Sequence, residues 1–219
     1  MGKLLKGAAA VLGLLTAAEA GGTAYFYRRT MKRYNAKTER TMKMSGVDWE
    51  KYFPLMHERH DWMMEQPHED VWITSHDGLK LHGTYFEGDG GDKAVICFHG
   101  YTSQGINDYG SLSYYYLNHG FRMLLIDERA HGESEGTYIG FGTMDRLDGM
   151  EWIKWMIDKI GDDAQILLHG NSMGGATVCM MSGLKLPPQV KGIVSDCAFT
   201  SAKDVFTHVL HSMYHLPAF

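Results

Sequence analysis

The sequence predicts an α/β fold whose sheet is mostly parallel and covered by helices on both faces. Three observations support this prediction. Short apolar runs alternate with segments of helical periodicity from Ala94 onward, as in parallel sheets. Asp77-Gly78 separates two strand-like runs, which predicts an antiparallel hairpin at the start of the sheet. Glycines surround Ser172, where an apolar run gives way to a small-residue segment, which predicts a sharp strand-to-helix turn.

The individual elements follow from composition and spacing. Apolar runs bounded by turn residues predict strands, at 71–74, 79–86, 94–98, 122–126, 166–168 and 190–195. Apolar residues at helical spacing, ended by glycine or proline, predict helices, at 111–118, 144–160, 176–184 and 202–213. The aromatic-rich segment 47–66 predicts a short helix that covers the domain, with a helix that rests on the membrane surface as the alternative.

The N-terminal segment predicts a membrane anchor. Residues from Leu4 to Tyr27 are mostly apolar or small, and their number is sufficient for a transmembrane helix. Aromatic residues and then Arg28 and Arg29 follow this run, an order typical of a membrane interface with its cytoplasmic side at the basic end. We therefore expect residues 1–30 to form a single-pass membrane anchor with the remaining chain in the cytoplasm.

Two alternatives to the anchor stay open at this point. Ala18-Glu19-Ala20 resembles a signal-peptide cleavage site, and cleavage there would release a secreted protein. The segment could also form a helix of a soluble protein. The division of the chain that we predict is an anchor at 1–30, a juxtamembrane and helical lead-in at 31–70, and an α/β domain at 71–219.

Composition argues against several classes of partner. The formal net charge is −5 and no basic stripe crosses the globular part, so we expect no nucleic-acid partner. Cys97, Cys179 and Cys197 lie in apolar or small-residue runs, which predicts buried free thiols and favours a reducing compartment. Asp61 stands where a zinc-binding H-E-x-x-H motif needs histidine; we expect no metal and no cofactor.

Ser172 is the main candidate for chemistry. It lies in Gly170-Asn171-Ser172-Met173-Gly174, a G-x-S-x-G motif that directly follows an apolar strand. In this context the turn pushes the hydroxyl out of the sheet and places it at a helix N-terminus, where developing negative charge is favoured. The motif therefore predicts a nucleophilic serine.

The chain resembles the α/β-hydrolase superfamily from about Val71 onward. Besides the serine turn, His99-Gly100-Tyr101-Thr102 ends an earlier strand, and the loop from Asp127 to Gly136 is similar to that of the monoacylglycerol lipase and serine aminopeptidase-like branch. That branch usually has glycine where Ala130 stands. The polar residues of this loop are interpreted as turn formers beneath the site.

The resemblance implies a serine hydrolase that acts on carboxylic esters, acyl lipids or small amides. Ser172 would form an acyl-enzyme. The backbone N–H groups of Met173 and Tyr101 would form the oxyanion hole that stabilises the tetrahedral intermediate. The expected partners of the protein are therefore a small-molecule ester, lipid or peptide substrate, and the membrane through its N-terminal helix.

The family also supplies an acid and a histidine after the serine, and the sequence offers only weak candidates for both. Asp196 ends the last predicted strand and could be the acid. His208, His211 and His215 lie close behind it on one predicted helix, where they are poorly placed to serve as the base. We therefore expect a C-terminally truncated member of the family that lacks the last strands. The alternative is a non-catalytic hydrolase-fold protein with a binding or scaffolding role at the membrane.

Overall fold

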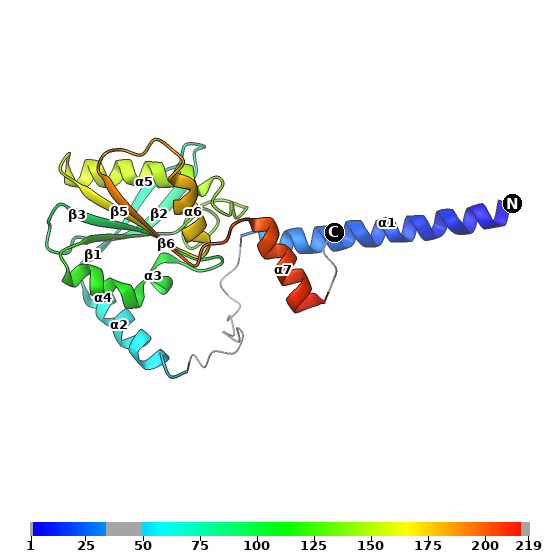
Figure 1. Ribbon diagram of the computed structural model, residues 1–219, viewed down its shortest axis with the longest axis horizontal. Coiled ribbons are helices and arrows are strands. Elements are labelled where there is room, and N and C mark those ends of the chain that lie inside the picture. The colour runs from blue at the N-terminus through cyan, green and yellow to red at the C-terminus, as the bar shows by residue number, and fades with distance from the viewer. Residues whose placement is uncertain (1, 34–49, 216–219) are drawn as a thin grey trace.

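The computed structural model describes residues 2–33 and 50–215, and its centre is a six-stranded mixed sheet (Figure 1). The order of the strands across the sheet is β1-β2-β4-β3-β5-β6. The strands span His68–Thr74 (β1), Lys80–Phe86 (β2), Lys93–Phe98 (β3), Arg122–Ile126 (β4), Gln165–Asn171 (β5) and Val190–Asp196 (β6).

One strand, β2, runs opposite to the other five. β1 and β2 form the antiparallel hairpin around Asp77-Gly78, and β2 also pairs antiparallel with β4. β4, β3, β5 and β6 are mutually parallel. Because these four strands point the same way, their carboxyl ends meet at one edge of the sheet, which is the edge where α/β proteins place their sites.

Helices cover both faces of the sheet. On one face, α5 (Asp145–Ile160) and α6 (Met173–Met181) bury Trp152, Ile153 and Val178 against the strands. On the other face, α2 (Phe53–Glu65) and α4 (Gly110–Asn118) bury Met63 and Tyr116. The short helix α3 (Gly105–Asp108) precedes α4. The two separate apolar clusters explain why the central strands are apolar on both sides.

Two further helices lie beside each other outside this body (Figure 1). α1 (Gly2–Met31) projects away from the sheet, and α7 (Ala202–Tyr214) lies near its C-terminal part. The stretch Lys6–Met31 is long and apolar enough to cross a membrane by length and composition, criteria that a signal sequence also meets. Leu12 and Leu14 on α1 are 66% and 72% exposed, so the protein itself does not cover them.

The predicted fold class is confirmed, including the antiparallel hairpin and the helices on both faces. Element ends differ by a few residues: the helix after Ser172 begins at Met173 rather than at residue 176. The short helix α3 had no periodic signal and was not predicted. The prediction of three buried thiols is wrong for two of them. All three are free, but only Cys97 is buried, because Cys179 and Cys197 lie on the exposed side near β6.

Candidate active site

The loops that follow the four parallel strands converge around Ser172. Gly100, after β3, lies against the serine turn: a Cβ added to this glycine would be 3.5 Å from Ser172 Cβ. Asp196, at the end of β6, accepts a hydrogen bond from the Ser172 N–H through its main-chain oxygen at 2.8 Å. Ser172 itself connects the end of β5 to the start of α6.

Ser172 has a strained backbone. Its φ is 53° and its ψ is −105°, a combination that side chains of L-residues rarely adopt and that typically costs about 1–3 kcal/mol. The turn around it is possible only with glycine on both sides. A Cβ at Gly170 would overlap the carbonyl of Gly174, and a Cβ at Gly174 would overlap the carbonyl of Phe98. The strand, the turn and the helix are therefore packed tightly enough to hold the serine in this conformation.

Both predicted oxyanion residues lie next to this turn. Met173 is the first residue of α6, so its N–H has no partner within the helix. Tyr101 follows Gly100, whose N–H donates to Asp108 Oδ2 at 2.6 Å. Asn171 Nδ2 donates to the same Asp108 oxygen at 3.2 Å. Asp108 thus connects the loop after β3 to the serine turn.

Asp108 is a positioning residue that sequence reasoning missed. Its other oxygen accepts a hydrogen bond from Ser103 Oγ at 2.5 Å, so one carboxylate fixes two loops. It lies in the four-residue helix α3, and a helix this short has no apolar periodicity that would indicate its direction.

Two buried histidines brace the loops without serving as a base. His99 Nε2 accepts from the Glu128 N–H at 3.0 Å, and His131 Nε2 accepts from the Thr102 N–H at 3.2 Å. Their rings lie 4.7 Å apart. Burial, together with the neighbouring His99, lowers the pKa of His131 to about 3, and burial also lowers the pKa of His99. Both rings are therefore neutral at pH 7, and the one acceptor nitrogen of each is already used.

The residues that the sequence offers as triad acid and base make no side-chain hydrogen bond to Ser172 within the described part of the chain. Asp196 contacts Ser172 through its main chain, and its side chain is exposed. His208 and His211 lie on exposed positions of α7, and His215 caps the end of this helix with a φ of 53°. Within residues 2–33 and 50–215, the Ser172 hydroxyl makes no hydrogen bond with any side chain.

Arg129, at the start of the loop from Asp127 to Gly136, organises a charged cluster beneath the site. Its guanidinium donates to both oxygens of Asp148, at 2.6 and 2.7 Å, and to both oxygens of Asp77, at 3.0 and 3.1 Å. The hydrogen bonds from Arg129 lower the pKa of Asp77. His76, Asp77 and Asp148 could offer metal ligands within 4.8 Å of one another. Since the Arg129 guanidinium donates to both carboxylates, it already supplies one positive charge at the place that an ion would occupy.

Two buried carboxyl groups lie deeper in the same region. Thr177 Oγ1, on α6, donates to Glu128 Oε1 at 2.8 Å, and the Gly142 N–H donates to Asp145 Oδ2 at 2.9 Å. Burial raises the pKa of Asp145 to about 6, and burial together with the nearby Asp145 charge raises the pKa of Glu128. These groups hold the start of α5 and the middle of α6 to the loop after β4.

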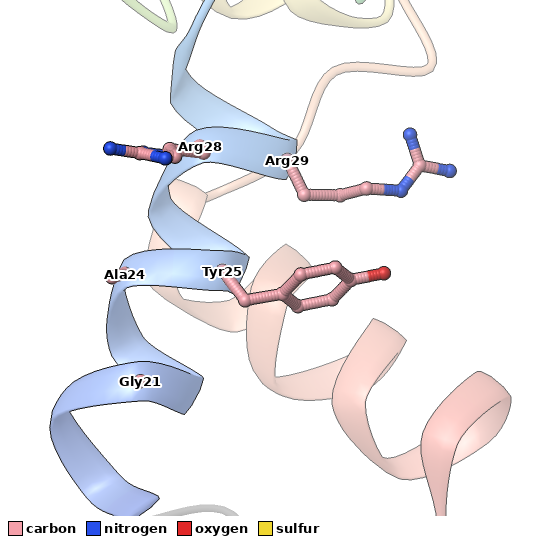
Figure 2. A pocket seen from close by; sticks show the side chains of 5 residues that line it. All are labelled: Gly21, Ala24, Tyr25, Arg28 and Arg29. Carbon is pink, nitrogen blue, oxygen red and sulfur yellow. The ribbon is translucent and has the colours of Figure 1, made fainter. Parts of the chain in front are cut away.

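A cavity on α1 lies apart from this centre (Figure 2). It is lined by Gly21, Ala24, Tyr25, Arg28 and Arg29, and the side chains of Tyr25 and Arg29 extend to the same side of the helix. Its position near the basic end of the candidate span does not overlap the residues around Ser172.

A mixed sheet with a strained serine at the β5–α6 turn defines the class of α/β hydrolases. The chain matches the alpha/beta hydrolase fold family over residues 93–217 and belongs to it. The esterase Pf2001 of Pyrococcus furiosus has a similar structure, with 28% sequence identity and a TM-score of 0.61 over 72% of this chain and 60% of the esterase chain.

Other similarities are more distant or concern a protein without a stated activity. The esterase EaEST of Exiguobacterium antarcticum shares the fold with a TM-score of 0.53 and 21% identity, over 66% of this chain and 56% of that chain. The uncharacterized protein YqkD of Bacillus subtilis strain 168 is 26% identical over 148 residues, which are 67% of this chain and 48% of that protein. The chain thus spans about half to three fifths of the length of these relatives.

Proposed function

We propose that this protein is a serine hydrolase in which Ser172 attacks a carboxylic ester, an acyl lipid or a small amide. The observation that carries the proposal is the conformation of Ser172, whose positive φ is held between β5 and α6 by glycines that admit no Cβ. Backbone strain of this kind persists where the surrounding structure fixes it, and it clusters at reactive residues.

The proposed chemistry begins with the Ser172 hydroxyl. Its oxygen attacks the carbonyl carbon while its proton passes to a general base, and the carbonyl oxygen becomes an oxyanion. The N–H groups of Met173 and Tyr101 are proposed to donate to this oxyanion, each contributing about 3 kcal/mol to transition-state stabilisation. Collapse of the tetrahedral intermediate expels the alcohol or amine and leaves the acyl group on Ser172, from which water later releases the acid.

A non-catalytic role is the second candidate. The observation in its favour is that the Ser172 hydroxyl has no hydrogen-bonded base within the described residues. In this case the fold would bind a ligand or partner at the membrane without turnover.

One experiment separates the two candidates. The full-length protein, solubilised in mild detergent, is assayed with a short activated ester and with a fluorophosphonate probe that labels nucleophilic serines. We expect Ser172→Ala to abolish both signals, and Ser182→Ala, which changes an exposed serine at the end of α6, to leave both unchanged. Equal turnover and labelling in wild type and Ser172→Ala would refute the nucleophile, and the complete absence of both in wild type would favour the binding role.

A further inference from the structure

The end of α1 lies directly on the loops that flank Ser172. Residues Thr30–Arg33, here called the strap, comprise the last two residues of the candidate membrane span and the two that follow it, and they contact two separate loops. One is the loop after β3 that carries Tyr101, and the other is the loop 130–139 after β4. These contacts join residues that are 71 to 108 positions apart in the sequence.

The strap is bonded to the loop 130–139 through its main chain and one side chain. The Ile139 N–H donates to Met31 O at 2.7 Å, and the Arg33 N–H donates to Thr137 O at 2.9 Å. Lys32 and Tyr138 between them form an antiparallel bridge. The guanidinium of Arg33 donates to the carbonyl oxygens of Gly132 and Ser134. The strap therefore acts as a short extra strand along this loop.

The strap also contacts the loop with the candidate oxyanion donor. The Tyr101 hydroxyl donates to Thr30 O at 3.0 Å, and the Tyr101 ring stacks on Phe141 at a centroid distance of 5.3 Å. Met31 packs against the cluster that includes Phe141 and Met173. The strap therefore contacts Tyr101 directly, and it packs against the apolar cluster that contains Met173, the residue of the other candidate donor.

A second connection runs between the two loops. His131, which neighbours the carbonyl of Gly132, accepts the Thr102 N–H at 3.2 Å. Thr102 has a φ of 54°, so its peptide sits in a conformation that needs external support. Movement of the loop 130–139 would thus be transmitted to the peptide next to Tyr101.

We propose that the strap is a positioning element of the active site, with Arg33 and the Tyr101 hydroxyl as its positioning groups. This inference rests on the proposed role of Ser172. The strap orients the Tyr101 N–H by holding its loop in place. The end of α1 therefore contributes to the geometry of the active site. With α1 in a bilayer, the strap would hold the loops that flank Ser172 close to the membrane surface.

The test uses point variants of the full-length protein in detergent micelles with a soluble short-chain ester. Arg33→Ala removes both guanidinium hydrogen bonds, whereas Arg33→Lys keeps the charge but not the two-pronged geometry. Tyr101→Phe removes only the hydroxyl and retains the ring and the candidate backbone donor. Arg29→Ala is the matched control, because Arg29 is an exposed arginine one turn earlier on α1.

Displacement of an oxyanion-hole N–H reduces the stabilisation of the transition state more than it reduces the binding of the substrate. We therefore expect Arg33→Ala and Tyr101→Phe each to lower kcat about tenfold, a loss in the range of small misplacements, with KM changed less than twofold. The rate of fluorophosphonate labelling should fall in parallel, and Arg33→Lys should lie between wild type and Arg33→Ala. Arg29→Ala should match wild type.

The outcomes separate this inference from the proposed function. Turnover that survives Ser172→Ala would overturn the nucleophile itself. If turnover depends on Ser172 but Tyr101→Phe and Arg33→Ala both match wild type and Arg29→Ala, the positioning role of the strap is refuted and the nucleophile is not. A rise in KM at constant kcat in Tyr101→Phe would also overturn the positioning role, because that pattern belongs to substrate binding and not to the oxyanion hole.

Discussion

Backbone strain at Ser172 predicts that glycine is a better residue than alanine at this position for stability. Ser172→Gly and Ser172→Ala both remove the hydroxyl, so their difference isolates the Cβ. At a φ of 53° and a ψ of −105°, the Cβ costs about 1–3 kcal/mol. Glycine loses roughly 0.5–1 kcal/mol more conformational entropy on folding. The balance favours Ser172→Gly over Ser172→Ala by about 1 kcal/mol.

The assay is thermal unfolding of the full-length protein in detergent, followed by circular dichroism. For a chain of this length, about 1 kcal/mol corresponds to roughly 2–4 °C in Tm. Ser195 provides the control, because it lies within β6 and has no positive φ. There Ser195→Gly should be less stable than Ser195→Ala, by roughly 0.5–1 kcal/mol. If Ser172→Gly is also the less stable of its pair, the serine is not strained and the reasoning fails.

Two further predictions concern the packing and the pH response of the same region. Gly174→Ala should destabilise the protein by about 3 kcal/mol, seen as a lower Tm, because the new Cβ overlaps the Phe98 carbonyl. The control is Gly183→Ala, whose Cβ would make only an ordinary contact at 3.6 Å and should change Tm little. Equal losses of Tm in the two variants would contradict the packing argument. For His131, burial lowers the pKa to about 3, below the ordinary value of 6.5, so the stability it contributes is complete above pH 6.5 and falls as the pH drops toward 3. Between pH 7 and pH 5 this loss of stability is about 2 kcal/mol. Over that interval the Tm of His131→Gln should therefore fall less than the Tm of the wild type. The control His119→Gln, which changes an exposed histidine, should show the same fall in Tm as the wild type.

The sequence predicted those parts of the fold that depend on local pattern. The strands are short apolar runs, and the helix α5 carries apolar residues at helical spacing, so composition alone located them. The serine turn was predictable for a different reason. Gly170 and Gly174 occupy positions where a Cβ would overlap the backbone, so the motif records a steric requirement that the folded structure also shows.

The supports of the site could not be predicted, because they are contacts between distant residues. Arg33 reaches the carbonyl of Ser134 across 101 positions, and Asp108 reaches Asn171 across 63. Neither residue lies in a periodic pattern or next to a recognisable motif. The buried histidines are similar: His99 was visible as the end of a strand, but its neutral, bracing role follows from the Glu128 N–H that it accepts.

Strain is concentrated at the edge of the sheet that carries the site. Thr102, Ala130, Ser172 and Cys197 all have positive φ, between 43° and 63°, and each lies shortly after one of the four parallel strands. A chance scatter of strained residues would not follow the strand ends. Ala130 shows how such a position is stabilised: at a φ of 63° glycine would avoid the penalty, but the alanine methyl is fully buried in a cluster with Met173, and burial of one methyl group contributes about 0.8 kcal/mol. Met31 of the strap packs against this same cluster, so the end of α1 helps to hold the strained loops in place.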